Sequence, residues 1–293
     1  MINYPTLIPE LYRRLSPCML CPHHCGVIRA GGKTGKCRTA TDISVASYTV
    51  HHGEEPSISG TRGSGTIFFS NCTLSCVFCQ NYPISQMGHG NIFSVDALAQ
   101  CMIELQSQGA HNINFVTPGH VIPMIVDAVF RARQKGMCLP LVYNSSGYED
   151  LETLKLLEGV IDIYLPDAKY ADSTQAMRYS SAENYAEINR IALKEMYRQV
   201  GTLKLDDCGI AKKGLIVRHL VLPNDSAGSV EILRFIAKEL STQVHISLMS
   251  QYHPAHETGR FPELNRRITP AEYQLVLDAL LDVGFENGWQ QDL

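Results

Sequence analysis

The sequence predicts an α/β protein built around a parallel β-sheet, and three observations carry this prediction. The 293 residues are 45% hydrophobic and 18% charged, a balance with which a chain of this length buries a large core and is not intrinsically disordered. Beyond residue 65, six short apolar runs alternate with six helical patterns. Most of these runs are continuously apolar, as in strands that are covered on both faces.

The apolar runs predict strands and the periodic segments predict helices, in alternating order. The strands are predicted at Thr66–Ser70, Asn112–Val116, Leu139–Tyr143, Asp162–Leu165, Gly214–Val221 and His245–Met249. The helices are predicted at Ser94–Gln108, Val121–Lys135, Tyr148–Leu157, Ala176–Val200, Ser229–Leu240 and Pro270–Val283. Parallel neighbours need a crossover of about a dozen residues, usually a helix, so each unit adds one parallel strand. Six units are too few for a closed eight-stranded barrel. This leaves an open partial barrel or a doubly wound sheet, both with functional groups at the C-terminal ends of the strands.

The first 60 residues differ in composition from the rest of the chain. They are rich in Cys, Gly and His, and an alternating stretch at Ile43–Val50 predicts one strand. The glycine-rich passage Gly60–Gly65 marks the beginning of the main domain. We therefore expect a Cys-rich metal-binding segment over residues 1–60 and a core domain over residues 61–293.

Composition also excludes several classes of protein. The chain has 25 Lys and Arg against 29 Asp and Glu, a net charge of −4 without basic runs, so nucleic acid is not expected as the main partner. No apolar run approaches the roughly 18 residues of a membrane-spanning helix, and the N-terminus lacks the pattern of a secretory signal. We therefore expect a cytoplasmic protein whose ten cysteines are reduced thiols available for metal.

Three cysteines directly follow the first predicted strand of the core domain. Cys72, Cys76 and Cys79 have the spacing Cys-x3-Cys-x2-Cys. Three thiolates on one loop can hold three corners of a [4Fe–4S] cluster and leave the fourth iron open to a small molecule. Zinc is the competing metal, but structural zinc takes four ligands, and no fourth cysteine follows nearby.

This motif, with the aromatic Phe78 before its third cysteine, resembles that of the radical S-adenosylmethionine (SAM) superfamily. The resemblance implies a partial (β/α)6 TIM-like barrel with a small Cys-rich N-terminal extension. It also implies that the open iron chelates the amino and carboxylate groups of SAM. An electron donor such as flavodoxin or ferredoxin would reduce the cluster, which then cleaves SAM to methionine and a 5′-deoxyadenosyl radical that abstracts a hydrogen atom.

The resemblance continues at the ends of the later strands. Thr117, Pro118 and Gly119 stand where the superfamily usually has Gly-Gly-Glu, so Thr117 and backbone carbonyls would have to receive the SAM amino group. Later strand ends resemble those of pyruvate formate-lyase activating enzymes. After the third strand, Asn144 stands in place of an aspartate and Ser146 follows it; after the fourth, Lys169 of the pair Asp167 and Lys169 would reach the SAM carboxylate. The resemblance extends to Arg218 on the fifth strand and to His253 after the sixth, where the histidine would be a further SAM contact. Each residue alone also fits an ordinary ion pair or cap, but their recurrence at successive strand ends favours function.

A second group of cysteines precedes the core domain. Cys18, Cys21, Cys25 and Cys37 can close a site of four thiolates, and the spacing does not distinguish structural zinc from an auxiliary iron–sulfur cluster. Together with the passage that leads into the central motif, this group resembles the PflX-like subgroup, homologues of pyruvate formate-lyase activating enzymes.

Three hypotheses about function follow from these motifs. The first is that the protein activates a glycyl radical enzyme by removing a hydrogen atom from a backbone glycine. The second is radical SAM chemistry on a small molecule or a peptide side chain, favoured by the missing Gly-Gly-Glu, by Asn144 and by the N-terminal cysteines. The third is a non-catalytic iron–sulfur protein that does not cleave SAM.

Overall fold

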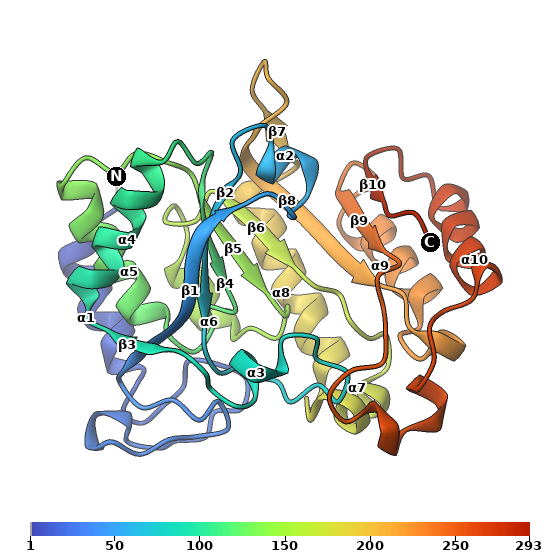
Figure 1. Ribbon diagram of the computed structural model, residues 1–293, viewed down its shortest axis with the longest axis horizontal. Coiled ribbons are helices and arrows are strands. Elements are labelled where there is room, and N and C mark those ends of the chain that lie inside the picture. The colour runs from blue at the N-terminus through green and yellow to red at the C-terminus, as the bar shows by residue number, and fades with distance from the viewer. Residues whose placement is uncertain (1) are drawn as a thin grey trace.

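The computed structural model describes residues 2–293 and arranges the strands of this part of the chain in one curved sheet (Figure 1). The order across the sheet is β10-β9-β8-β6-β5-β4-β2-β1-β3, and β7 (Lys204–Leu205) pairs with β8 beside this path. The parallel strands are β2 (Ser64–Phe69), β4 (Ile113–Val116), β5 (Leu141–Ser145), β6 (Ile163–Pro166), β8 (Ala211–Leu220), β9 (His245–Met249) and β10 (Gly288–Gln290).

These parallel strands follow one another across the sheet in the order of the chain. In a doubly wound sheet the order reverses at one point and the helices cover both faces. Here right-handed crossovers in a single direction place the helices on one face, so the sheet curls into an open partial barrel. The expectation of a partial barrel is confirmed, and the doubly wound alternative is excluded.

All six predicted strands are present, each beginning within three residues of its expected position. The seventh parallel strand, β10, pairs with β9 but was not predicted, because three residues are too few to show a period. The predicted strand near the N-terminus is β1 (Ile43–His51), which lies antiparallel between β2 and the short β3 (Asn91–Phe93). Residues 43–51 therefore belong to the main sheet although they lie in the proposed N-terminal segment, and the division at residue 60 remains a prediction.

The crossover helices form where helical patterns were predicted. They are α4 (Val95–Ser107), α5 (Ile122–Gln134), α6 (Leu151–Leu156), α9 (Ser229–Glu239) and α10 (Pro270–Asp282). Side-chain caps begin several of them, such as Ser94 on α4 and Asp150 on α6. The predicted helix Ala176–Val200 is instead two helices, α7 (Ser173–Ser180) and α8 (Tyr185–Val200). Ser181 and Asn184 have a left-handed φ of 52°, which ends a right-handed helix.

Shorter helices complete the fold outside the predicted pattern. The helix α1 (Tyr4–Arg13) packs against α5, α2 (Pro56–Ser59) follows β1, and α3 (Tyr82–Ser85) follows the cysteine loop. Within the described chain, no helix combines the length and the apolar character needed to cross a bilayer.

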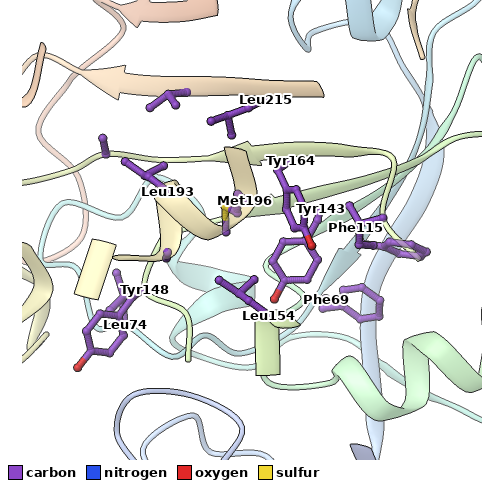
Figure 2. Packing of buried hydrophobic residues seen from close by; sticks show 14 of the residues in the cluster. Phe69, Leu74, Phe115, Tyr143, Tyr148, Leu154, Tyr164, Leu193, Met196 and Leu215 are labelled. Atoms are coloured by element: carbon purple, nitrogen blue, oxygen red, sulfur yellow. The ribbon is translucent and has the colours of Figure 1, made fainter. Parts of the chain in front are cut away.

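The two faces of the sheet bury different sets of side chains. Figure 2 shows the face under the helices, where the Tyr143 and Tyr164 rings meet at 5.8 Å and the Phe69 and Phe115 rings at 6.3 Å. Along each strand, every second side chain points to the other face, into the barrel. These inward side chains form a smaller apolar cluster with Ile58 of α2, and its other members are Val142, Ile163, Leu165, Ala211 and Ile216. The barrel is therefore packed with apolar side chains at one end, and its polar interior lies towards the carboxyl ends of the strands.

Candidate functional site

The predicted cluster ligands lie on the loop after β2, at the carboxyl edge of the parallel strands. Cys76 is buried, and Cys72 and Cys79 are partly buried. Each sulfur has its own hydrogen-bonding neighbour: the Leu74 N–H at 3.3 Å from Cys72 Sγ, Ser180 Oγ at 3.0 Å from Cys76 Sγ, and Ser85 Oγ at 3.1 Å from Cys79 Sγ. Because these neighbours come from the loop itself, α7 and α3, the three thiols are held by separate parts of the fold.

The chemistry of these donors fits an iron–sulfur cluster. Burial raises the pKa of Cys72 to about 12 and that of Cys76 to about 11, while the Lys169 ammonium lowers the pKa of both thiols. Such thiols become thiolates only when a cation compensates the charge, as cluster iron does. Among residues 2–293, no three His, Cys, Asp or Glu side chains converge closely enough to hold a single metal ion. The assignment of these cysteines as cluster ligands remains a prediction.

A partly buried network of charges lies beside the cysteine loop. Lys169 Nζ donates to Asp167 Oδ2 at 2.7 Å, and Arg218 Nε donates to Asp167 Oδ1 at 2.9 Å. Arg218 Nη2 also donates to Asn144 Oδ1 at 2.6 Å. Burial opposes ionisation of Asp167, but Arg218 and Lys169 together hold its pKa below the ordinary value. The structure therefore brings together predicted site residues from β5, β6 and β8.

Two further predicted residues join the loop after β9 to the cysteine loop. The ring of Phe78 meets that of Tyr252 edge-on, with centroids 5.8 Å apart. His253 Nδ1 lies 3.1 Å from Nε2 of Gln80, the residue after Cys79. His253 is exposed, so it stands at the rim of the site.

The segment in the Gly-Gly-Glu position has an unusual geometry. Thr117 adopts a left-handed φ of 59°, and its N–H donates to the Asn144 carbonyl at 2.9 Å. Pro118 follows it. A Cβ on Gly119 would lie 2.9 Å from Glu149 Oε2, so a larger residue there would displace the Glu149 carboxyl group. Ser146 uses its carbonyl to accept a hydrogen bond from the Tyr185 hydroxyl at 2.8 Å.

Glu149 was missed by the sequence analysis. It is buried after β5, accepts a hydrogen bond from the Tyr143 hydroxyl at 2.9 Å, and has a pKa that burial raises to about 7. The segment that lacks a glutamate in sequence thus has a carboxyl group beside it in space. Only the packing of two consecutive strand-end loops could reveal this, because Glu149 has no motif of its own.

The second cysteine group packs onto the cysteine loop of the core. Cys18, Cys21 and Cys37 are buried and Cys25 is partly buried. Burial raises the pKa of Cys18 and of Cys21, and a neighbouring thiol adds a smaller rise to each, Cys25 to that of Cys18 and Cys37 to that of Cys21. His23 Nε2 lies 2.7 Å from the Thr73 carbonyl, and Arg38 donates to the Ser85 carbonyl at 2.6 Å. A four-thiolate site in this group, and the metal that it would hold, remain predictions.

A cavity of about 260 Å³ opens beside Arg218 at the edge of the barrel. Its walls come from the β1–α2 loop and from the ends of β8, β9 and β10: Gly53, Glu54, Glu55, Pro56, Arg218, Ser247, Met249, Gln251 and Trp289–Gln291. Burial raises the pKa of Glu54 to about 7, although Arg218 opposes this rise. Sequence reasoning missed Glu54 and Glu55, since two acids before a proline fit an ordinary helix start. Only the antiparallel pairing of β1 carries them to the barrel.

Comparison with solved structures places this fold in a class. Methylornithine synthase (PylB) aligns with a TM-score of 0.50 at 13% identity, over 74% of this chain and 62% of that one. HydG, a maturase of the [FeFe]-hydrogenase, aligns with a TM-score of 0.54 at 13% identity, over 77% of this chain and 50% of that one. The chain therefore spans less than two thirds of either structure. The fold of this chain is a partial TIM-like barrel of the radical SAM type.

Comparison with curated proteins identifies the family. The uncharacterized protein MJ0674 of Methanocaldococcus jannaschii is 31% identical over 269 residues, which are 89% of this chain and 73% of that protein. The uncharacterized protein MJ0808 of the same organism is 24% identical over 294 residues, covering 92% of this chain and 78% of that protein. No family model matches the sequence. The chain belongs to the family of MJ0674.

Proposed function

We propose that the protein is a radical SAM enzyme in which Cys72, Cys76 and Cys79 hold a [4Fe–4S] cluster and the open iron binds SAM. The observation that carries this proposal is the cysteine loop at the carboxyl end of β2, faced by the partly buried Lys169–Asp167–Arg218 network. When bound, the reduced cluster supplies an electron to SAM and so generates a 5′-deoxyadenosyl radical. The protein orients the reactants and excludes water.

The residues around the loop have roles that their contacts support. We assign Lys169 to the SAM carboxylate, because a charge-assisted hydrogen bond is roughly twice as strong as a neutral one. Asp167 holds Lys169 and Arg218 in place from two sides. Asn144 is engaged with Arg218 and positions it, which leaves the SAM amino group to Thr117 and to backbone carbonyls of residues 117–119.

The proposal also assigns roles to the residues around the cluster site, to the N-terminal cysteines and to an electron donor. Phe78 packs the cysteine loop, and Ser146 and His253 lie at its rim. The N-terminal cysteines hold zinc or an auxiliary iron–sulfur cluster, in a Cys-rich segment that extends to residue 60 and joins the main sheet through β1. A flavodoxin or ferredoxin in the cytoplasm would supply the electron.

Two substrates are consistent with this chemistry. Activation of a glycyl radical enzyme is supported by the resemblance of Asn144, Asp167, Lys169 and Arg218 to positions in activating enzymes. Action on a small molecule or a peptide side chain is supported by the cavity of about 260 Å³ beside Arg218, because a partner protein's glycine loop needs an open mouth and not a small pocket. We favour the second substrate class. Oxygen-free enzyme that produced a glycyl-radical EPR signal on a partner protein would instead establish the first.

The decisive experiment is SAM cleavage by cluster-reconstituted protein under reducing, oxygen-free conditions. We expect 5′-deoxyadenosine from the wild type, and neither a full cluster nor 5′-deoxyadenosine from Cys76→Ala. Cys101→Ala is the matched control, since Cys101 is a buried thiol of α4 outside the site. A Cys76→Ala protein that cleaves SAM at the wild-type rate contradicts the proposal. Wild-type protein that binds a cluster without cleaving SAM is instead the non-catalytic iron–sulfur protein.

A further inference from the structure

The cavity beside Arg218 is connected to the proposed cluster site by direct contacts. Arg218 lines the cavity and reaches Asp167, which in turn holds Lys169 near the cysteine loop. At the rim, Gln80 Nε2 donates to the carbonyl of Gln251 at 3.1 Å. The cavity therefore adjoins the site where the proposed chemistry starts.

Two acidic side chains enter this cavity from outside the barrel. The Glu54 side chain is 9% exposed and Glu55 is 8% exposed, so both are removed from bulk water. Glu54 Oε1 accepts a hydrogen bond from Asn114 Nδ2 at 3.0 Å, and its other oxygen lies 3.7 Å from Arg218 Nη1. Buried carboxylates of this kind are costly unless each oxygen is paired.

The pairing of these acceptors is incomplete. Glu55 Oε2 and Asn114 Oδ1 are buried, and neither has a hydrogen-bond partner among residues 2–293. Both atoms are acceptors, whereas the nearest cation, Arg218, already donates to Asp167 and Asn144. Glu55, which lines the cavity, thus has an acceptor without a donor, and so does Asn114, which contacts the lining residue Glu54.

The charges have the same imbalance. Among the residues that line the cavity, Glu54 and Glu55 supply two carboxyl groups, and Arg218, which already donates to Asp167 and Asn144, supplies one cation. An anionic ligand would meet the acidic wall, and a neutral hydroxyl would leave a buried negative charge uncompensated. An ammonium or guanidinium group supplies several donors, no acceptor and a positive charge.

We propose that this cavity binds the substrate by a primary ammonium or guanidinium group held between Glu54 and Glu55. The inference rests on the radical SAM function proposed above and names the chemical class of its substrate. The volume of about 260 Å³ is just below the roughly 300–1,000 Å³ of typical ligand pockets, so the substrate part that enters is a short chain.

The test measures binding of simple probes to the full-length, cluster-reconstituted protein with SAM. Calorimetric titration compares n-butylammonium and n-butylguanidinium with n-butanol and butyrate, which have similar length and lack the positive charge. The cations are expected to bind more than about tenfold more tightly than the other two probes. Butanol or butyrate binding as tightly as the cations overturns the proposal, and this comparison needs no variant.

Variants then assign the site. Glu55→Gln keeps the shape of the side chain and removes its charge, so it is expected to weaken binding of both cations about tenfold or more. Glu152→Gln is the matched control, because Glu152 is exposed on α6. Cation binding by Glu55→Gln at the wild-type affinity contradicts the proposal.

A lysine tripeptide capped at both ends distinguishes the two sources of an ammonium group. Binding as tight as that of butylammonium assigns a protein side chain, and binding of butylammonium alone assigns a free amine; both outcomes support the substrate class. The function itself is tested separately by 5′-deoxyadenosine formation in wild-type protein without any probe. If the wild-type protein forms no 5′-deoxyadenosine, the proposed function fails but the binding measurement remains valid, because selective cation binding does not depend on SAM cleavage.

Discussion

At the scale of single residues, the site combines groups whose charges depend on one another. Arg218 and Lys169 hold the pKa of the partly buried Asp167 below its ordinary value, because they donate to its two oxygens. Glu54 has a weaker compensation, since Arg218 Nη1 is 3.7 Å away, and burial dominates its pKa. The pKa of Asp167 is therefore lowered and that of Glu54 is raised, because Arg218 lies closer to Asp167 than to Glu54.

Because the pKa of Glu54 is raised in the folded protein, we expect the free energy of unfolding to depend on pH. The folded-state pKa of about 7 lies above the ordinary value of 4.5, so the folded protein binds more protons between these values. The contribution of Glu54 to the free energy of unfolding is full below pH 4.5 and decreases as the pH rises through 7, by up to about 3 kcal/mol. Urea unfolding of wild type and Glu54→Gln at pH 5 and pH 8 measures the difference.

Glutamine cannot titrate, so the wild type should lose stability relative to Glu54→Gln at the higher pH. A difference between the two proteins that stays constant from pH 5 to pH 8 contradicts the prediction. Glu286→Gln, an exposed acid outside the site, controls for the general effect of pH on the chain.

At the scale of elements, the N-terminal segment is attached to the core by a buried cation. Arg29 is 1% exposed and donates through Nε to the Ala40 carbonyl at 2.6 Å and through Nη1 to the His120 carbonyl at 2.9 Å. His120 directly follows the segment in the Gly-Gly-Glu position. Arg29 thus joins the second cysteine group to the edge of the barrel that carries the site.

Replacing Arg29 by Met is expected to loosen the N-terminal segment. Loss of charged hydrogen bonds to two carbonyls costs about 3–6 kcal/mol before relaxation, at about 1.5–3 kcal/mol for each bond. Trypsin should then cleave faster at Lys33 and Lys36, which lie in this segment, and mass spectrometry of timed digests measures the rate. Arg260→Met, an exposed arginine, should leave the rate unchanged. Equal rates in Arg29→Met and wild type would count against the attachment.

The last helix supplies a second prediction at this scale. Thr269 and Glu272 form a capping box at the start of α10, with the Thr269 N–H donating to Glu272 Oε2 at 2.8 Å. Thr269→Ala should lower the free energy of unfolding by about 1 kcal/mol, or the Tm by about 2–4 °C. Thermal unfolding checks this, and Gln274→Ala on the exposed face of the same helix should change the Tm by less. An unchanged Tm in Thr269→Ala means that the cap contributes nothing.

At the scale of the whole molecule, the two cysteine groups lie on segments that contact each other. His23 contacts Thr73 and Arg38 contacts Ser85, so the N-terminal segment covers the loop that carries Cys72, Cys76 and Cys79. A metal in the first group would therefore stabilise the surroundings of the second.

Removing one ligand of the N-terminal group tests this relation. Cys37→Ser is expected to lower solubility and Tm and to release one equivalent of zinc, or the iron of one cluster, in metal analysis. Cys208→Ser, at an exposed thiol, is the control and should change neither. Full metal content and an unchanged Tm in Cys37→Ser contradict a structural metal site.

The sequence by itself determined the order of elements and the residues at the strand ends. Strands such as β4 and β9 were predictable because a buried strand is a continuous apolar run, and the cysteine spacing lies within one loop. Local patterns also determined that Asp167, Lys169 and Arg218 stand at the carboxyl ends of their strands, since a parallel sheet puts these ends on one edge.

Only the tertiary structure decided which distant groups meet. Glu54, Glu55 and Glu149 have no local signal, and the curvature of the sheet and the pairing of β1 bring them to Arg218 and Gly119. The same applies to the break between α7 and α8, where left-handed residues interrupt a sequence with helical periodicity. A pattern in sequence records burial and period along one element, whereas contacts between elements depend on how all the faces pack at once.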